Sequence, residues 1–179
     1  MKSKEEHVME PFFNSPKHWH FEELRNTIRI SRPQLSYWLK KLEKDRIIKR
    51  VKPRGRMPYY TGMENPEFYN RKRLYGLQKL TNSGLFDHLS ALKHAKVVVL
   101  FGSFARSDWY LDSDIDLFIY GSDEELDSHG YEMKLHHDIQ VHLAKDKKDL
   151  KRMDRLLPYI VSGDFIKGSV QDLGVQIHA

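Results

Sequence analysis

The chain carries two kinds of hydrophobic pattern. In its first third, apolar residues recur three and four positions apart, which is the spacing of an amphipathic helix. One such stripe consists of Leu35, Trp38, Leu39 and Leu42. It predicts a helix that begins after Ser31, a residue that caps helices well. A shorter stripe predicts a preceding helix over 21–28, so this part of the chain holds two helices joined by a short link.

A β-hairpin is predicted after these two helices. The extended segments "IIKRV" and "PYYTG" bracket "KPRGRM", whose tip is predicted at residues 53–56. Another helix is predicted over 65–83, because Asn65 suits the N-cap and Pro66 suits the first helical position. The first half of the chain is therefore helical with one hairpin.

The second half of the chain has the pattern of strands separated by short helices. "KVVVLFGS" is an apolar, β-branched run of strand length, and "DSDIDLFIYG" follows it as a second strand. A third strand is predicted in "HDIQVHLAK", after the helical segment "DEELDSHGYEMKLH". With a further helix over 84–95, this pattern predicts an α/β domain with a small mixed sheet.

Charge divides the chain in the same way as the hydrophobic pattern. Of the 179 residues, 40% are hydrophobic, which is enough for a core. Residues 1–82 contain 19 Lys and Arg against 9 Asp and Glu, a net charge of +10, and residues 83–179 contain 11 against 16, a net charge of −5. We therefore expect an α+β protein with an N-terminal domain over 1–64, a linker helix over 65–83 and a C-terminal domain over 84–179. Uneven surface charge on a single domain is the alternative.

The composition also excludes several classes of site and location. The chain has no cysteine, which removes disulfides and thiolate zinc sites. No apolar run approaches the roughly 18 residues of a membrane span, and the first ten residues lack the apolar stretch of a signal peptide. We therefore expect a cytoplasmic protein that has no membrane partner.

The basic half presents cations on the outer face of its second helix and on its hairpin. The order of helix, helix and basic hairpin resembles a winged helix-turn-helix domain, which implies nucleic-acid binding. A cationic helix face fits the major groove, and a basic hairpin tip reaches phosphates or the minor groove. The candidate nucleic-acid contacts are Gln34, Ser36, Tyr37, Lys40, Lys41, Arg54 and Arg56. The alternatives are an ordinary solvated face and a protein-interaction module.

Two acidic residues interrupt the second strand of the acidic half. Side chains alternate across a strand, so Asp114 and Asp116 are expected to share one face. Burying two like charges is costly unless a cation compensates, and Mg²⁺ commonly binds one or two carboxylates together with substrate phosphates. Upstream, Gly102 permits a tight turn, Ser103 begins a predicted helix whose N–H groups can hold an anion, and Arg106 adds a cation. The alternative is a turn-capping cluster, because "LDSD" has turn character.

This part of the chain resembles the DNA polymerase β-type nucleotidyltransferase superfamily, and most of all its minimal members. The resemblance rests on the glycine-serine pair at 102–103, which follows the first predicted strand, and on the "DID" at 114–116 in the second. The resemblance covers about residues 84–170. It implies a nucleoside triphosphate donor, two metal ions and transfer of a nucleoside monophosphate to a hydroxyl group. Gly102 and Ser103 match the triphosphate-binding turn of the family, and the two aspartates match its first two metal ligands.

The same family usually has a third carboxylate on the following strand. The position expected for it, between the apolar residues of 137–145, holds Gln140. Asp138 lies one step earlier, at the strand edge, and would serve in a different register. His142 is able to take a proton, whereas glutamine is not.

Two kinds of function follow from these features. The first is a Mg²⁺-dependent enzyme that transfers a nucleoside monophosphate to an unknown hydroxyl acceptor, while the N-terminal domain holds a nucleic acid or a protein. The second is a DNA-binding regulator or a toxin–antitoxin component whose C-terminal domain binds nucleotide but is catalytically impaired, which the glutamine at 140 favours. Apolar positions in the linker helix also suggest a homodimer or a protein partner.

Overall fold

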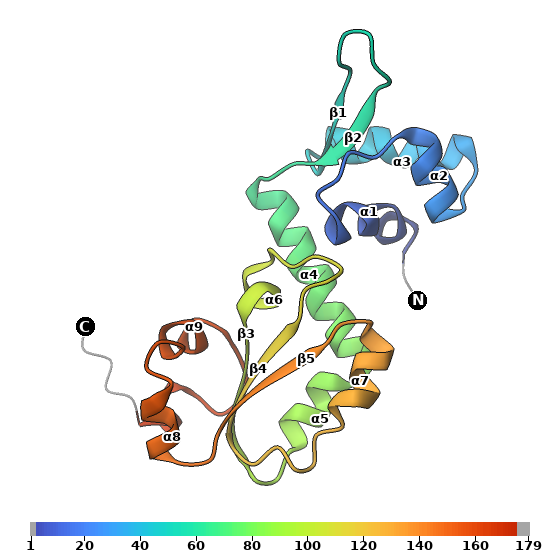
Figure 1. The fold of residues 1–179 in the computed structure, drawn as a ribbon. Helices are drawn as coiled ribbons and strands as arrows, with labels where there is room; N and C mark the ends of the chain where they lie inside the picture. Colours follow the sequence, from blue (N-terminus) through green and yellow to red (C-terminus); the bar gives the residue numbers. More distant parts are fainter. Residues whose placement is uncertain (1–2, 175–179) are drawn as a thin grey trace. The chain divides into compact units, whose positions relative to one another are not determined.

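The computed structural model of the chain describes residues 3–174. The chain forms two compact units, residues 1–75 and residues 76–179 (Figure 1). Their boundary falls inside α4 (Pro66–Ser83), so this helix starts in one unit and ends in the other. Within the described stretch, no helix is both long enough and apolar enough to cross a membrane.

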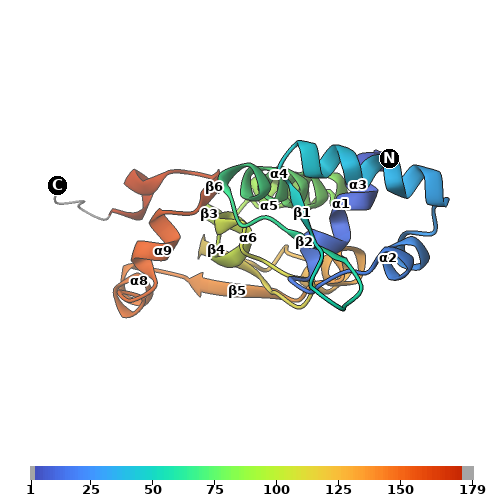
Figure 2. The same cartoon turned by 90° about the horizontal axis from the view of Figure 1, so that it is seen from above.

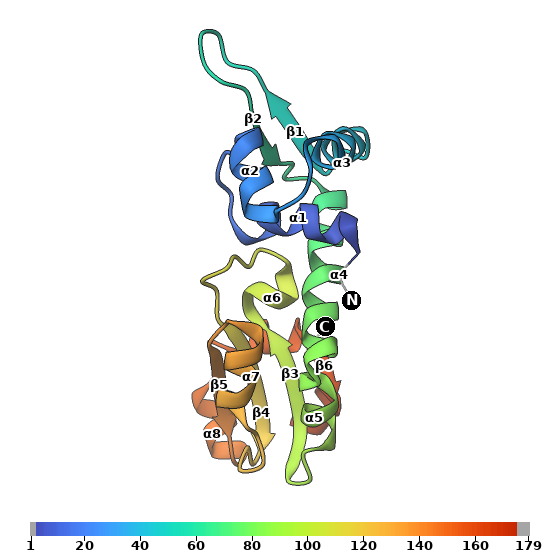
Figure 3. The same ribbon diagram turned by 90° about the vertical axis from the view of Figure 1, so that its right-hand side faces the viewer.

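Three helices and a hairpin make up the N-terminal unit, together with the start of α4. Its other elements are α1 (Lys4–Asn14), α2 (Phe21–Ile28), α3 (Arg32–Lys44), β1 (Ile48–Val51) and β2 (Tyr59–Gly62). The hairpin is antiparallel and pairs Ile48 with Gly62 and Val51 with Tyr59. Figure 3 shows its tip projecting away from the helices. Helices α2 and α3 and the hairpin lie where the sequence predicts them.

The helix-spaced apolar residues form the core of this unit. Leu35, Leu39 and Leu42 of α3 are fully buried, as is Leu24 of α2. Burying one such side chain contributes roughly 1.5–3 kcal/mol relative to leaving it exposed. At the start of α3, the hydroxyl of Ser31 accepts a hydrogen bond from a backbone N–H of the first turn. The face that predicts α3 in the sequence is thus the face that α3 buries.

Helix α1 is the element that sequence analysis missed. The hydroxyl of Ser3 accepts from the backbone N–H of Glu6 at 3.1 Å, and the Glu6 carboxylate accepts from the N–H of Ser3 at 2.8 Å. This reciprocal capping box starts a helix that buries Phe12 and Phe13. The capping-box residues stand in "SKEE", a helix-start signal that the sequence analysis did not use.

The C-terminal unit is a four-stranded sheet with helices on both sides. Its elements after α4 are α5 (Leu85–Ala91), β3 (Ala95–Phe101), α6 (Gly102–Arg106), β4 (Ile115–Gly121), α7 (Ser128–Leu135), β5 (Ile139–Ala144), α8 (Lys147–Arg152), α9 (Leu157–Val161), β6 (Asp164–Lys167) and the 3₁₀-helix η1 (Val170–Leu173). The strand order is β5-β4-β3-β6. Strands β4 and β5 are parallel, and the other neighbours are antiparallel, which confirms the predicted small mixed sheet.

Both faces of the central strand β3 are covered. Val97, Val99 and Phe101 point to the face that packs against α8, α9 and η1. Helices α5 and α7 lie on the other side, as Figures 1 and 2 show for α5 against α8 and α9. Every residue of β3 except Lys96 is therefore buried, which explains the uninterrupted apolar run in the sequence.

Candidate functional site

The turn between β3 and α6 accepts only glycine at its first position. Gly102 has a φ of +70°, in the left-handed region that side chains disfavour. A Cβ added there would overlap the carboxylate of Asp116 and would stand 2.7 Å from its Cγ. The backbone of Gly102 is therefore packed directly against the Asp116 side chain, and the glycine turn and the acidic strand are in contact.

A short loop connects α6 to the acidic strand and is held at both ends. Helix α6 ends at Arg106, and the residue that caps it, Ser107, is buried and left-handed with a φ of 68° and donates its backbone N–H to the carbonyl of Ser103. The ring of Phe104, inside α6, stacks on the buried ring of Trp109 in the loop, with centroids 5.0 Å apart. The hydroxyl of Ser113 accepts from the N–H of Tyr110 at 2.8 Å. These contacts fix the course of the loop from α6 to the start of β4.

Asp114 and Asp116, together called the acid doublet, differ in their surroundings. Strand β4 begins at Ile115, so Asp114 lies just before the strand rather than inside it, and it is exposed. Asp116 lies within the strand, and its side chain is 22% exposed. The backbone N–H of Ile115 donates to the carbonyl of Asp138 at 2.8 Å, which anchors this segment to the chain before β5. Asp114 is therefore free to meet a ligand, and Asp116 is held by the sheet.

Electrostatics at the doublet favour a nearby cation. Burial raises the pKa of Asp116 above its ordinary range. The Asp114 carboxylate adds to this rise in pKa, while His142 and Arg106 oppose it. The charged form of Asp116 is thus costly in the folded chain, and positive charge close to it lowers that cost.

The neighbouring strand β5 presents an amide and an imidazole to Asp116. The parallel register pairs Asp116 with Gln140, which is exposed. Nε2 of His142 lies 3.6 Å from Oδ1 of Asp116. Asp138 precedes β5 and is exposed. The register therefore places Gln140, and not Asp138, beside Asp116.

The other candidate nucleotide ligands lie around the same turn. The hydroxyl-bearing Ser103 is half-buried in the first turn of α6. Arg106 at the end of α6 is exposed and forms an ion pair with Asp108 at 3.2 Å. It is close enough to Asp116 to lower the pKa of that carboxyl. The structure thus brings Gly102, Ser103 and Arg106 to the edge of the acid doublet.

A cavity of about 490 Å³ opens beside Asp114. Four carboxylates and three imidazoles line it, from the loop before β4, one side of α7 and the turn before β5. Sequence analysis did not single out one of them, His137, which is 5% exposed and whose Nδ1 lies 2.8 Å from the carbonyl oxygen of Ser113. Burial lowers the pKa of His137. The size suits a small molecule, and the acidic lining disfavours a triphosphate.

The donor groups of the doublet fit Mg²⁺. Carboxylate oxygens are the ligands that Mg²⁺ prefers, and it keeps waters and takes substrate phosphates for its remaining positions. Among residues 3–174, no group of three or more histidine, cysteine or acidic side chains is placed so that it could hold a metal ion. The ligands that the doublet offers to Mg²⁺ are thus two carboxylates, those of Asp114 and Asp116.

The candidate nucleic-acid contacts lie on α3 and at the hairpin tip. Gln34, Tyr37 and Lys40 are exposed on α3, and Ser36 is half-buried there. Tyr37 is the most notable, because 62% of this large aromatic residue is exposed. At the hairpin tip the exposed residues include Arg54 and Arg56. The structure thus leaves these groups accessible to a partner.

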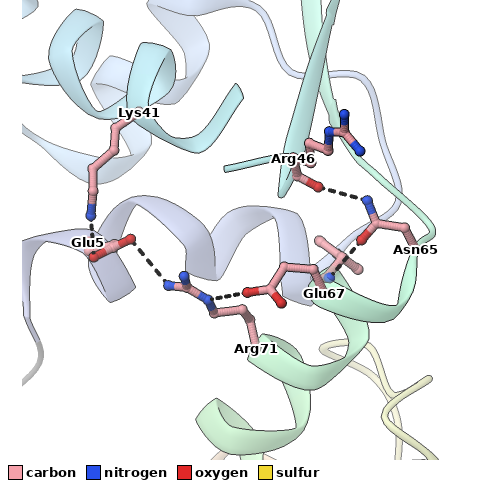
Figure 4. Close-up of polar contacts among 7 residues, drawn as sticks. Glu5, Lys41, Arg46, Asn65, Glu67 and Arg71 are labelled. Carbon is pink, nitrogen blue, oxygen red and sulfur yellow. Dashed lines mark hydrogen bonds and ion pairs between the residues drawn. The ribbon is translucent and has the colours of Figure 1, made fainter. Parts of the chain in front are cut away.

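Lys41, the remaining candidate on α3, is engaged within the N-terminal unit (Figure 4). Its ammonium lies 2.9 Å from the carboxylate of Glu5 on α1. The other oxygen of Glu5 lies 3.3 Å from Arg71 on α4, and Arg71 also pairs with Glu67 at 3.0 Å. Glu5 therefore ties α1 to both α3 and α4, and Lys41 has a structural partner that its sequence position did not reveal.

The comparison with known families adds one finding. Residues 85–169 match the family described as "Polymerase beta, Nucleotidyltransferase". The match begins at the first residue of α5, ends shortly after β6, and includes the glycine turn and both aspartates. It supports the nucleotidyltransferase superfamily for this segment, and the mixed sheet with its helices fits such a domain. No curated protein and no solved structure matches the chain.

Proposed function

We propose that the C-terminal unit is a Mg²⁺-dependent nucleotidyltransferase that moves a nucleoside monophosphate from a nucleoside triphosphate to a hydroxyl acceptor. The observation that carries this proposal is the packing of the Asp116 carboxylate against the backbone of Gly102. It brings the turn proposed to bind phosphate against one of the two carboxylates proposed to bind the metal. The family match over residues 85–169 supports the same reaction class.

The triphosphate is proposed to bind on the side of the glycine turn. Gly102 has no side chain to block the approach of phosphate oxygens, and Ser103 adds a hydroxyl donor. The guanidinium of Arg106 is 56% exposed and neutralises phosphate charge when it turns from Asp108 to the ligand. All three groups come from five consecutive residues, so the turn positions them together.

The doublet is proposed to hold the metal through Asp114 and Asp116. When bound, Mg²⁺ supplies charge neutralisation on the phosphate oxygens during transfer. Asp116 contributes a carboxylate whose orientation the sheet sets, and Asp114 contributes one that is exposed to the incoming substrate. The raised pKa of Asp116 is consistent with a site built to receive positive charge.

Gln140 sets a limit on this chemistry. It lies beside Asp116 in the sheet, and its amide takes no proton from the acceptor hydroxyl at neutral pH. We therefore propose slow transfer in the wild type, and faster transfer in Gln140→Asp, which restores a carboxylate next to Asp116. A decrease in transfer by Gln140→Asp would contradict this role for position 140.

We also propose that the N-terminal unit is a winged helix-turn-helix domain that binds nucleic acid. The support is the exposed, cationic and aromatic surface formed by α3 and the hairpin tip. Tyr37 and Gln34 lie at the start of α3, where side chains of a recognition helix reach base edges. Arg54 and Arg56 are proposed to contact the phosphate backbone.

The test of the enzyme proposal uses the full chain with each α-³²P-labelled nucleoside triphosphate, Mg²⁺ and a panel of nucleic-acid and protein acceptors. Transfer of label by the wild type and its loss in Asp114→Asn with Asp116→Asn would support it. Asp123→Asn is the control, because this aspartate follows β4 and lies outside the doublet. Equal labelling by the wild type and the double variant would overturn the proposal.

A second function is favoured by the glutamine beside Asp116. In this reading the protein is a nucleic-acid-binding regulator whose C-terminal unit binds nucleotide without turnover. It predicts that calorimetry detects Mg²⁺-dependent binding of a non-hydrolysable triphosphate while no acceptor is labelled. Labelling that depends on Asp116 would exclude it.

A further inference from the structure

We propose that His142 is a positioning residue that holds the Asp116 carboxylate in its orientation toward the glycine turn. The inference deepens the proposed function and rests on it for the importance of Asp116. It concerns the geometry of one carboxylate, so it is testable on the folded chain without any reaction.

The two oxygens of Asp116 are held from opposite sides. Oδ2 faces the backbone of Gly102, where an added Cβ would overlap it. Oδ1 faces Nε2 of His142 at 3.6 Å. With one oxygen against the turn and the other toward the imidazole, rotation of the carboxylate about its Cβ–Cγ bond breaks one of the two contacts.

Among the described residues, Nε2 of the imidazole faces Asp116 without a competing acceptor. Nε2 of His142 is buried, and within residues 3–174 it has no hydrogen-bond partner. Its distance of 3.6 Å from Oδ1 of Asp116 is longer than a standard hydrogen bond, so the contact is a close approach of a donor and an acceptor. Burying an N–H without an acceptor is unfavourable, which favours a hydrogen bond to the facing oxygen of Asp116.

The ring of His142 is itself fixed by packing. It meets the ring of Phe101 edge to face, with centroids 5.1 Å apart and an interplanar angle of 63°. Strand β4 lies between the strands that carry these two rings, so they meet over the strand that carries Asp116. The strand register also pairs His142 with Phe118, which belongs to the hydrophobic core on this face of the sheet. The imidazole thus has little freedom to turn away from the carboxylate.

A positioning role does not depend on the charge of His142. An Nε2–H group is a donor in the Nε2-protonated neutral tautomer and in the imidazolium alike. What the ring supplies is a fixed donor two residue pairs farther along the sheet than Gln140. Partners of this kind, which orient a ligating carboxylate, typically change metal affinity by 10–100-fold when removed.

The first experiment is a pair of crystal structures of the full chain. His142→Phe keeps a ring but removes the donor, and His142→Gln keeps an N–H donor near the Nε2 position. We expect the Asp116 carboxylate to rotate away from Gly102 in His142→Phe and to stay in place in His142→Gln. An unmoved carboxylate in His142→Phe would overturn the proposal, whatever the protein's activity. If His142→Phe does not fold, His142→Leu replaces it with the same expectation.

The second experiment measures Mn²⁺ binding by calorimetry in the presence of a non-hydrolysable triphosphate. His142→Phe is expected to weaken binding about tenfold or more, with His142→Gln restoring most of the loss. His129→Phe is the control, because its side chain is 85% exposed on α7. Wild-type affinity in His142→Phe, with loss in Asp116→Asn, would overturn the role of His142 and leave the proposed function standing. A wild type that binds no Mn²⁺ would count against the proposed function instead, and the crystal structures would then decide the role of His142.

Discussion

The two units of this protein carry their candidate functional groups in opposite ways. In the N-terminal unit these groups lie on the surface, where Tyr37 is 62% exposed and the hairpin tip offers Arg54 and Arg56 to solvent. In the C-terminal unit the key carboxylate, Asp116, is only 22% exposed and lies between Gly102 and His142. The proposed nucleic-acid surface depends on accumulated charge, whereas the proposed transfer site depends on the placement of single groups.

This difference determines how each unit responds to substitution. Exposed cations contribute to nucleic-acid binding in additive, salt-dependent steps, so no single residue is indispensable. A half-buried carboxylate packed against a backbone has no substitute of the same shape and charge. Substitutions in the C-terminal site should therefore be severe and specific, and those on the basic surface should be graded.

The largest effect is expected from Gly102→Ala. The added Cβ would overlap the Asp116 carboxylate at a φ that strains any side chain, so we expect a loss of about 3 kcal/mol in the free energy of unfolding. Denaturant unfolding measures it. Gly55→Ala is the matched control, because Gly55 has a φ of +71° but no atom within 4 Å of an added Cβ. Equal losses in the two variants would show that backbone strain alone matters.

The doublet should separate stability from activity. The pKa of Asp116 is raised in the folded chain, so above the ordinary carboxyl pKa the folded state binds more protons than the unfolded state. The free energy of unfolding therefore falls as pH rises from the ordinary carboxyl pKa through the raised pKa of the folded state. Asp116→Asn should therefore be more stable than wild type at pH 7, while transfer falls by about a hundredfold or more.

The control for this prediction is Asp114→Asn. Asp114 is exposed, so its substitution should change the free energy of unfolding by less than about 0.5 kcal/mol. Chemical denaturation between pH 4 and 8, about the range in which carboxyl groups with raised pKa titrate, compares the two variants. If Asp116→Asn is less stable than wild type at pH 7, burial of the charged Asp116 carboxylate does not destabilise the folded chain, and the prediction is wrong.

The hairpin tip should show the graded behaviour of a surface. Arg54→Ala combined with Arg56→Ala is expected to weaken duplex DNA binding and to reduce the slope of log K against log salt by about 2, because two phosphate contacts are lost. Fluorescence anisotropy over a salt series measures the slope. Arg152→Ala, which removes one positive charge, is the control, since Arg152 is 79% exposed in the other unit. An unchanged slope in the double variant would remove the hairpin from the binding surface.

The bridge formed by Glu5 should contribute a smaller amount. Glu5→Gln removes ion pairs to Lys41 and Arg71 from a side chain that is 21% exposed, so we expect a loss of about 1 kcal/mol at low salt. Thermal unfolding at low and high salt measures it. Glu67→Gln, where the carboxylate is 52% exposed, should lose less. A larger loss in Glu67→Gln would mean that Glu5 does not hold the helices together.

The smallest expected effect concerns the pH response of His137. Burial lowers its pKa, so below about pH 6.5 the unfolded chain binds a proton that the folded chain excludes, and stability falls as pH falls. His137→Phe should flatten this part of the stability curve, even if it lowers stability overall. His129→Phe, at an exposed histidine, should leave the slope as in wild type. Parallel curves for wild type and His137→Phe would contradict the prediction.

Local patterns predicted much of the secondary structure in both units. Helix α3 was readable because its apolar spacing is also its buried face, and β3 was readable because a strand covered on both faces is apolar throughout. Helix α1 was missed, because the capping box in "SKEE" was not used as a helix-start signal. The sequence also suggested that Asp114 lies inside the strand, whereas β4 starts one residue later.

The sequence by itself determined the chemical inventory of the candidate site: a glycine-serine turn, a pair of aspartates and a glutamine and a histidine on the following strand. Tertiary structure alone decided which of these groups touch. Strand register placed Gln140 beside Asp116, and close packing put Oδ1 toward His142 and Oδ2 toward Gly102. The physical reason is that contacts between distant strands depend on how the whole sheet pairs and packs, which local residue preferences do not determine by themselves.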